Sequence, residues 1–314
     1  MKKTGIVILN YNGSSFLELT LDSLLRAKTN CAFEVGVIDN GSEKNDADNA
    51  QRITDKYLAK GLKGFFIRSE KNLGFSGGNN VVIKRFLEDS EITNICMLNS
   101  DVIVTDYWLD YLTEKDYDAV GPVTNATGNE QTVSVDYEVK PNQAAFKLAN
   151  QFAKYRHETF KGLEFETSIL YFFNTIISRR VIEKIGFLDE RFYPGSFEDG
   201  DYCLRMKKAG FHQMIVRGCY VHHFGSGSFS KLEMSNRINI SNVNRRRFEE
   251  KWNMKWESDT WKLLLSCQED MEQFENKTID SRSAKLLKKS LEETQQLIRS
   301  WADGIEWFQS EQYI

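Results

Sequence analysis

The N-terminal third of the chain alternates apolar runs with helical segments, and polar residues follow the end of each apolar run. We expect strands at Gly5–Asn10, Phe33–Ile38, Lys63–Arg68 and Asn94–Leu98. The spacing of the apolar residues between these runs predicts helices at Ser15–Ala27, Ala47–Lys60 and Asn80–Leu87. Strands and helices that alternate in this order form a mostly parallel sheet with helices on both faces. The sequence therefore predicts an α/β fold.

The rest of the chain is less regular. Residues 124–165 carry few secondary-structure signals, and we interpret part of this stretch as a mobile loop. Beyond it we expect strands at Ser168–Ile177 and Gln213–Val221, and helices at Arg179–Ile185 and Glu198–Ala209. After about residue 232 the pattern is helical and charged. We divide the chain into a core domain, residues 1–254, and a helical C-terminal extension, residues 255–314.

The C-terminal extension carries Trp and Leu residues at helical spacing and no catalytic pattern. Such spacing is typical of a helix that packs against its own domain or against another subunit. We therefore expect this segment to mediate homo-oligomer contacts or docking on a membrane surface. The basic cluster Arg245–Arg247 precedes it, and we interpret this cluster as a solvated helix face rather than a phosphate site.

Charge and hydrophobicity exclude two classes of partner. The formal net charge of −4 gives no electrostatic basis for nucleic acid binding. No run approaches the roughly 18 apolar residues of a membrane-spanning helix, and the run Gly5–Leu9 is too short for a signal peptide. We expect a cytoplasmic protein that reaches the inner face of the cell membrane only by peripheral association.

The candidate functional residues follow the predicted strands. In open α/β sheets, ligands bind beyond the carboxyl ends of the strands. The polar groups at those ends are Asn10-Tyr11-Asn12, Asp39-Asn40, the segment Asn72–Asn80 and Asn99-Ser100-Asp101. We therefore expect the chemistry at this edge of the sheet.

Two of these strand ends carry an aspartate. A carboxylate such as Asp101 can hold Mg²⁺ or Mn²⁺, which bridges it to substrate phosphates, although an aspartate at this position can equally cap a turn. Asp39 can accept hydrogen bonds from a nucleobase or ribose, and the alternative is an Asp-Asn-Gly turn. Spacing alone does not decide between these interpretations.

The segment Asn72–Asn80 is rich in glycine and lies between a strand and a helix. Gly74, Gly77 and Gly78 would allow a ligand to approach the backbone closely, with Asn79 beside it. The segment matches neither the dinucleotide-binding nor the P-loop pattern. By itself a glycine-rich turn of this kind is weak support for a binding site.

The second half of the chain carries acidic and histidine side chains that are also candidates for function. Glu198, Asp199 and Asp201 begin a predicted helix, where acids either complement the helix dipole or present a general base. His222 and His223 follow a strand, and a neutral imidazole there could ligate a metal or bind a diphosphate. A structural or solvated histidine pair is the alternative.

Taken together, these motifs resemble the family 2 inverting glycosyltransferases with the GT-A fold, over about residues 4–254. The motifs are ILNYNG at 8–13, VIDNGS at 37–42, NLGFSGGNN at 72–80, MLNSDV at 97–102, IGFLDERFYPGSFEDGDYCLRMKKAG at 185–210 and HHFGSGSF at 222–229. The combination of NLGFSGGNN with LNSD is most similar to the rhamnosyltransferase-like branch, which builds bacterial surface polysaccharides. The resemblance implies a Rossmann-like, mostly parallel sheet and a nucleotide-sugar donor, with a glycan or lipid-linked glycan as acceptor.

The resemblance also implies roles for single residues. Asp39 would bind the nucleotide base, Asp101 would be the last acid of a DxD metal motif that here begins with Asn99, and Asp199 would be the catalytic base. His223, or otherwise His222, would lie near the Mn²⁺ or Mg²⁺ ion and the diphosphate. Asn10, Tyr11, Asn12, Gly74, Gly77, Gly78, Asn79, Asn99 and Glu198 complete the predicted substrate-binding set.

Two alternatives differ from a glycosyltransferase in what they would do. A sugar nucleotidyltransferase would need a basic, glycine-rich phosphate loop after the first strand, where this chain has Asn10-Tyr11-Asn12-Gly13. A catalytically silent sugar-binding or scaffold subunit is compatible with the missing first acid of the DxD motif and with the long helical extension.

Overall fold

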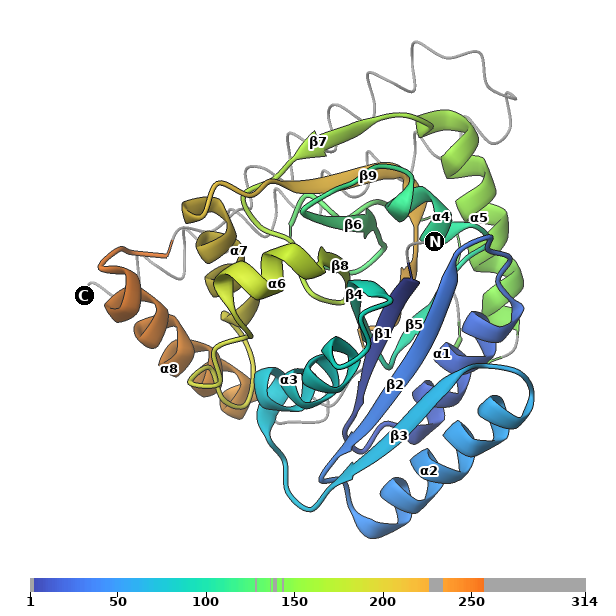
Figure 1. The fold of residues 1–314 in the computed structure, drawn as a ribbon, viewed down its shortest axis with the longest axis horizontal. Coiled ribbons are helices and arrows are strands. Elements are labelled where there is room, and N and C mark those ends of the chain that lie inside the picture. The colour runs from blue at the N-terminus through green and yellow to red at the C-terminus, as the bar shows by residue number, and fades with distance from the viewer. Residues whose placement is uncertain are drawn as a thin grey trace.

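An eight-stranded sheet organises the core, as seen in a computed structural model of the chain (Figure 1). The structure describes residues 3–256, except 128, 136, 138, 139, 143 and 226–233. The strand order is β3-β2-β1-β4-β8-β6-β9-β7. The strands are β1 (Lys3–Asn10), β2 (Ala32–Asn40), β3 (Gly64–Ser69), β4 (Ile92–Asn99), β6 (Ala119–Val123), β7 (Glu164–Glu166), β8 (Asn174–Ser178) and β9 (Gln213–Tyr220). A small second sheet pairs β5 (Val102–Ile103) with β10 (His222–His223).

The N-terminal half of the sheet is parallel, as the sequence predicts. β1 pairs in parallel with β2 and with β4, and β2 pairs in parallel with β3. β8 runs antiparallel to β4 and β6, and β7 runs antiparallel to β9. The carboxyl ends of β1, β2 and β4 therefore meet at one edge. This is the mostly parallel GT-A arrangement that the motifs imply.

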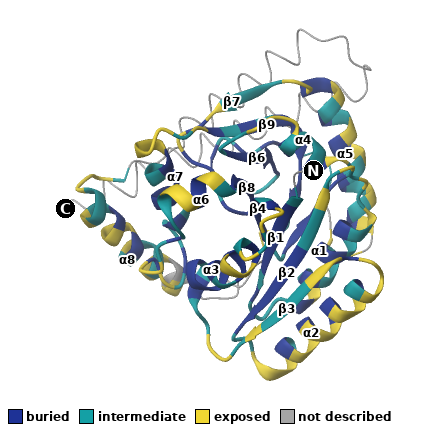
Figure 2. Ribbon diagram, in the orientation of Figure 1, coloured by how far each residue is buried: buried dark blue, intermediate teal, exposed yellow. Residues whose placement is uncertain are grey.

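Helices cover both faces of the sheet, and Figure 2 shows the buried residues concentrated in the central strands. One apolar core lies under α1 (Ser14–Arg26), α2 (Lys44–Ala59) and α4 (Trp108–Thr113). The opposite core lies under α3 (Gly74–Leu87), α5 (Ala144–Phe160), α6 (Arg179–Ile185) and α7 (Glu198–Lys208). A last helix, α8 (Met234–Trp252), follows residues 226–233. Within the described residues, no helix combines the length and the apolar character needed to cross a bilayer.

The structure corrects the predicted start of α3. The helix begins at Gly74 rather than at Asn80, so the glycine-rich segment forms its first turns. The Asn72 side chain accepts from the Gly74 amide at 2.7 Å, and Asn40 accepts from the Leu73 amide at 3.0 Å, which satisfies orphan donors of the first turn. A Cβ atom on Gly78 would lie 2.4 Å from Leu9. Close packing on the sheet therefore outweighs the low helix propensity of glycine.

Two further predictions were wrong in part. Residues 124–165, where the sequence carries few signals and part of the stretch is interpreted as a mobile loop, contain α5 at Ala144–Phe160. Its apolar periodicity is weak in the sequence because its buried side includes small alanines and the polar Arg156. The strand expected from Ser168 begins only at Asn174. Residues 168–173 are irregular, although most of their side chains are buried, and a buried apolar run does not by itself distinguish a strand from a packed loop. The predicted C-terminal extension lies almost entirely outside the described residues.

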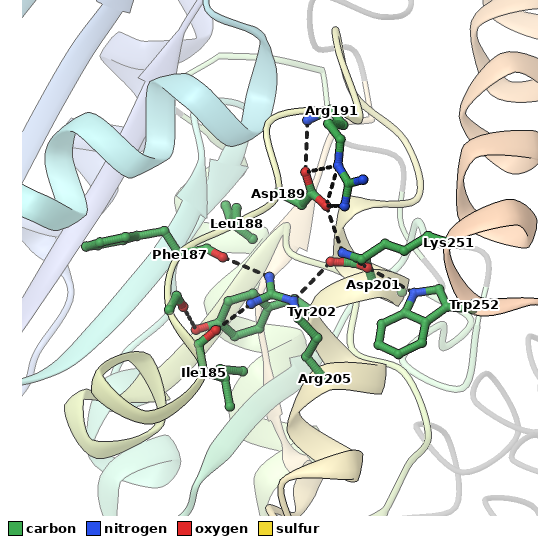
Figure 3. A network of polar contacts seen from close by, with 12 residues as sticks. Ile185, Phe187, Leu188, Asp189, Arg191, Asp201, Tyr202, Arg205, Lys251 and Trp252 are labelled. Atoms are coloured by element: carbon green, nitrogen blue, oxygen red, sulfur yellow. Dashed lines mark hydrogen bonds and ion pairs between the residues drawn. The ribbon is translucent and has the colours of Figure 1, made fainter.

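Buried charges fix α8 to α7 (Figure 3). The Asp201 side chain is fully buried, and its Oδ1 lies 2.6 Å from Lys251 Nζ and accepts from Trp252 Nε1 at 2.9 Å. Its other oxygen accepts from Arg205 Nε at 3.1 Å. Lys251 Nζ also lies 2.7 Å from Asp189 Oδ2, and this carboxylate has its pKa well below the usual range through hydrogen bonds from Arg191 and Lys251, despite its partial burial. Asp201, one of the three acids at the start of α7, therefore has a structural role.

Replacing Lys251 by Met is expected to lower the free energy of unfolding by about 3 kcal/mol, because the buried Asp201 carboxylate would lose one of its cationic partners. Urea denaturation followed by fluorescence measures this change. Lys44→Met serves as the control, since its pair with Asp48 is solvent-exposed and contributes at most about 1 kcal/mol. Equal effects of the two substitutions would show that the buried network does not stabilise the fold.

Candidate active site

A cavity of about 570 Å³ opens at the carboxyl ends of β1, β2 and β4. The first turn of α7 and the connection at residues 193–196 form its other side. Seven of the residues predicted from the sequence line it: Tyr11, Gly74, Asn99, Asp101, Glu198, Asp199 and His223. Segments that are distant in sequence therefore converge on one crevice at the expected edge of the sheet.

Asp101 and His223 face each other in this cavity. Asp101 follows β4 and is 3% exposed, and its Oδ1 lies 3.3 Å from His223 Nε2. The other ring nitrogen, Nδ1, lies 2.8 Å from the Ala126 carbonyl oxygen, which can only accept. Nδ1 therefore carries a proton, and Nε2 is the nitrogen directed at the carboxylate.

The pKa of the His223 imidazole is raised. Burial opposes the charged form, but the hydrogen bond and the negative charge of Asp101 outweigh burial. In the neutral ring with Nδ1 protonated, Nε2 and the carboxylate oxygen would both be acceptors, so a proton or a cation must lie between them. This pair consequently favours positive charge at the bottom of the cavity.

The donor set at this pair fits a divalent cation. A carboxylate oxygen and an imidazole nitrogen both suit Mn²⁺, and Mg²⁺ commonly binds one or two carboxylates together with substrate phosphates and water. Among the described residues there is no group of three or more His, Cys, Asp or Glu side chains placed to hold a metal. Asp101 and His223 would therefore supply only part of the coordination, and the substrate would supply more.

The structure brings His223, rather than His222, to Asp101. His222 Nδ1 lies 3.0 Å from the Tyr220 hydroxyl, and the side chain does not line the cavity. Burial, followed by the charge of His223, lowers the pKa of His222 to about 4. His222 is therefore a neutral, packed histidine at physiological pH.

Asn125 orients His223 and was not predicted from the sequence. Its side-chain amide donates to the His223 carbonyl oxygen at 2.9 Å, and its oxygen accepts from the His223 amide at 2.8 Å. Both backbone groups of His223 are thereby fixed. Asn125 lies at the start of residues 124–165, where no periodicity marks a functional position.

Glu198 and Asp199 lie in the first turn of α7 and also line the cavity. Burial raises the pKa of Asp199 to about 6, although a hydrogen bond from the Gly200 amide at 2.8 Å acts in the other direction. The pKa of Glu198 is raised well above its ordinary value by burial and then by the charge of Asp199. Both shifts have burial as their main cause, and the larger upward shift of Glu198 favours the negative charge of the pair on Asp199. A carboxylate with this pKa suits a general base that works near pH 7.

Asn10, Asn12 and Asp39 lie behind the cavity rather than in its lining. Asp39 is fully buried, and its oxygens accept from Asn10 Nδ2 at 3.0 Å, from Ser42 Oγ at 2.6 Å and from the Ser42 amide at 3.2 Å. Asn12 Oδ1 accepts from the Glu43 amide at 2.8 Å. These bonds join the ends of β1 and β2 to the start of α2. Tyr11, between the two asparagines, is the member of this turn that reaches the cavity.

The glycine-rich segment contributes one glycine to the cavity wall. Gly74 has a φ of +73°, and a Cβ atom there would meet the Tyr193 ring at 2.8 Å. Gly77, Gly78 and Asn79 do not line the cavity. They lie on the buried side of α3, where the glycines allow close packing.

An apolar, mostly aromatic part of the lining was also not predicted as part of the site. Tyr171–Phe173, Tyr193 and Ile240 line the cavity next to Phe75, which belongs to the predicted segment Asn72–Asn80. Tyr171–Phe173 belong to the apolar run that the sequence assigned to a strand, so the pattern gave no reason to place them at a ligand.

Comparison with known proteins bears on the family and the fold. Residues 5–186 match the model of glycosyl transferase family 2. The chain is 25% identical to a chondroitin synthase of Pasteurella multocida and 23% identical to one of Escherichia coli, in each case over 70% of its own length. It spans only 24% and 34% of those relatives, respectively.

Two solved structures have similar folds. GalNAc-T7, solved with UDP, GalNAc and Mn²⁺, gives a TM-score of 0.52 at 17% identity, covering 70% of this chain and 43% of that one. Residues 1–349 of Staphylococcus aureus TarS, solved with UDP-GlcNAc, give a TM-score of 0.50 at 16% identity, covering 97% and 92%. At these identities the similarity establishes the fold. The family match covers more than half of the chain, and the chain therefore belongs to glycosyl transferase family 2.

Proposed function

We propose that this glycosyltransferase moves a sugar from a nucleoside diphosphate donor to an acceptor hydroxyl with inversion at the anomeric carbon. One observation carries the proposal: Asp101 with His223, and Glu198 with Asp199 in the first turn of α7, line the same cavity. A reaction of this kind needs a group that binds the leaving diphosphate and a base that takes the acceptor proton. The two pairs provide both within one crevice.

The proposed donor site is at Asp101 and His223. A divalent cation, Mn²⁺ or Mg²⁺, would be held there with the donor diphosphate and would offset the charge that develops on the leaving group. Asn99 Nδ2 lies 3.4 Å from His223 Nε2 and helps to fix the ring. Tyr11, at the end of β1, borders the same side, where the nucleoside would lie.

The proposed base is Asp199. Its carboxylate accepts the proton of the acceptor hydroxyl while the acceptor oxygen bonds to the anomeric carbon and the bond from that carbon to the diphosphate oxygen breaks. Attack from the face opposite the leaving group inverts the anomeric configuration. Burial and the charge of Asp199 raise the pKa of Glu198, which favours the negative charge of the pair on Asp199. The helix start holds both groups on a rigid element.

The proposed substrates are a UDP-hexose or dTDP-rhamnose as donor and a bacterial surface polysaccharide or lipid-linked glycan as acceptor. The chondroitin synthases among the relatives support polysaccharide synthesis, and the structures solved with UDP or UDP-GlcNAc support a uridine nucleotide. The rhamnosyltransferase-like motifs keep dTDP-rhamnose in the set. We place the reaction in the cytoplasm, with lipid-linked acceptors met at the inner face of the membrane.

A donor screen tests this function. UDP-glucose, UDP-galactose, the UDP-N-acetylhexosamines and dTDP-rhamnose are each added with Mn²⁺, and the thermal shift and the slow hydrolysis of the donor are measured. At least one donor is expected to raise Tm, with EDTA abolishing the shift. Binding without hydrolysis or transfer would indicate a silent sugar-binding subunit. Release of pyrophosphate from a nucleoside triphosphate and a sugar phosphate would indicate a nucleotidyltransferase.

A further inference from the structure

Hydrogen bonds from α8 and α3 hold the connection that leads into α7. Asn244 of α8, whose side chain is fully buried, donates from Nδ2 to the Gly195 carbonyl oxygen at 2.7 Å and to that of Tyr193 at 3.3 Å. On the other side, the Phe75 amide of α3 donates to the Pro194 carbonyl oxygen at 2.8 Å. Three consecutive carbonyl groups are therefore held from α8 and α3.

A second side chain of α8 strengthens this attachment. Arg247 Nη1 donates to the Arg191 carbonyl oxygen at 2.7 Å and to Asn244 Oδ1 at 2.8 Å. The network of Lys251 and Asp201 in Figure 3 fixes the same helix to α7 one turn further along. The backbone at residues 191–195 is consequently rigid, although it forms no regular secondary structure.

On this fixed backbone, the Tyr193 ring remains open to solvent. Its residue is 51% exposed, it lines the cavity, and its ring packs over Gly74, where no Cβ is present. Tyr193 and Asp199 belong to one short segment at the cavity. A base must come within about 3 Å of the acceptor hydroxyl, so the segment that carries the base also borders the acceptor.

The charges at this side of the cavity favour an uncharged ligand. Among the described lining residues the acidic groups are Asp101, Glu198 and Asp199, and no lysine or arginine is present. A divalent cation with the donor diphosphate would balance Asp101, whereas the charge of Asp199 stays at the acceptor side. A carboxylate or phosphate on the acceptor would be repelled by this charge.

We propose that Tyr193 is the platform on which a neutral sugar ring of the acceptor stacks, and that Asn244 is the residue that positions this platform. The inference rests on the proposed function. The C–H face of a pyranose ring and the face of a tyrosine ring both lose apolar surface to water on contact, and the ring loses little conformational freedom because its backbone is held. The acceptor sugar that contacts Tyr193 is therefore neutral rather than one that itself carries a carboxylate or a phosphate.

Saturation-transfer NMR tests the platform in the presence of UDP and Mg²⁺. The probes are methyl β-glycosides of glucose and galactose and their matched C6 carboxylates, the glucuronide and galacturonide. At least one neutral glycoside is expected to bind, with the matched uronide weaker by about fivefold or more, and Tyr193→Ala is expected to weaken the neutral glycoside about tenfold. Tyr193→Phe keeps the ring and is expected to bind as the wild type does.

The role of Asn244 is tested by comparing how its replacement changes the acceptor KM and the donor KM. In Asn244→Ala, we expect the acceptor KM to rise about tenfold while the donor KM and donor hydrolysis stay within about twofold. Arg246→Ala is the control and is expected to change neither constant, because the contact of this exposed side chain among the described residues is to the Asn242 carbonyl oxygen of α8 itself. A general loss of stability would instead lower donor hydrolysis and acceptor use together.

The outcomes separate this inference from the proposed function. If the wild type fails to bind UDP or any donor, the proposed function is wrong. Three outcomes would show that the platform is wrong while the donor site stands, provided that UDP binds. They are that no neutral glycoside binds, that uronides bind as tightly as neutral glycosides, or that Tyr193→Ala binds neutral glycosides as tightly as Tyr193→Phe does. If Asn244→Ala leaves the acceptor KM unchanged, its positioning role is wrong.

Discussion

Asp199→Asn is expected to lower kcat for sugar transfer by about 10³-fold while changing donor affinity by no more than about twofold. The amide keeps the size of the side chain and can still meet the Gly200 amide through its oxygen, but it cannot accept the acceptor proton. Transfer to an acceptor is followed by product chromatography, and donor affinity by calorimetry with the same nucleotide sugar. Near-normal kcat in this variant would remove Asp199 from the role of base.

The pH dependence and Glu198→Gln identify which member of the acidic pair is the base. Because Asp199 must be ionised to act, and its pKa is raised to about 6, kcat/KM is expected to fall as the pH decreases below about 6. Gln resembles the protonated Glu198, so Glu198→Gln is expected to keep activity within about tenfold and to keep the acidic limb. Loss of transfer in Glu198→Gln with activity retained in Asp199→Asn would reverse the two roles.

Asp101→Ala is expected to have the second large effect, on the affinity for the nucleotide. We expect the affinity for UDP in the presence of Mn²⁺ to fall about 100-fold, because the cation would lose its carboxylate ligand and the diphosphate would lose the cation. In EDTA the wild type and the variant are expected to bind UDP equally weakly. Calorimetry in both buffers measures the four affinities.

His223→Ala extends this test to the second proposed ligand. It is expected to reduce the Mn²⁺-dependent affinity in the same direction, whereas His222→Ala should leave the metal-dependent component unchanged, because the His222 ring contacts Tyr220 rather than the cavity. An Asp101→Ala variant that binds UDP as the wild type does in Mn²⁺ would rule out the metal site at this strand end.

The location of the proposed donor site at this edge of the sheet could be predicted from sequence for physical reasons. β1, β2 and β4 are short apolar runs, and consecutive α/β units form parallel neighbours whose carboxyl ends share one edge. Asp101 follows β4 directly, so its approximate location required only that rule. Asp199 was placed on a helix start by its pattern, and the family resemblance supplied the role.

Other parts of the prediction failed because local patterns are ambiguous. The glycine-rich start of α3 is helical through packing on the sheet, against the low helix propensity of glycine. α5 was missed because its buried face combines small alanines with Arg156, which weakens the apolar periodicity. The run at 168–173 has the composition of a strand but packs as an irregular segment. For the start of α3 and for this run, long-range contacts outweigh the local preference.

By itself, the sequence determined the α/β architecture and the edge of the sheet that carries the candidate site, since periodicity and strand-end position are local properties. The family resemblance of its motifs added the roles of the two aspartates on which the proposal depends. Only the tertiary structure decided that His223 and not His222 meets Asp101, that Asn125 fixes its backbone, and that α8 holds Tyr193 at the cavity through Asn244. These are contacts between residues far apart in the chain. They depend on strand register and helix packing, which a local pattern does not specify.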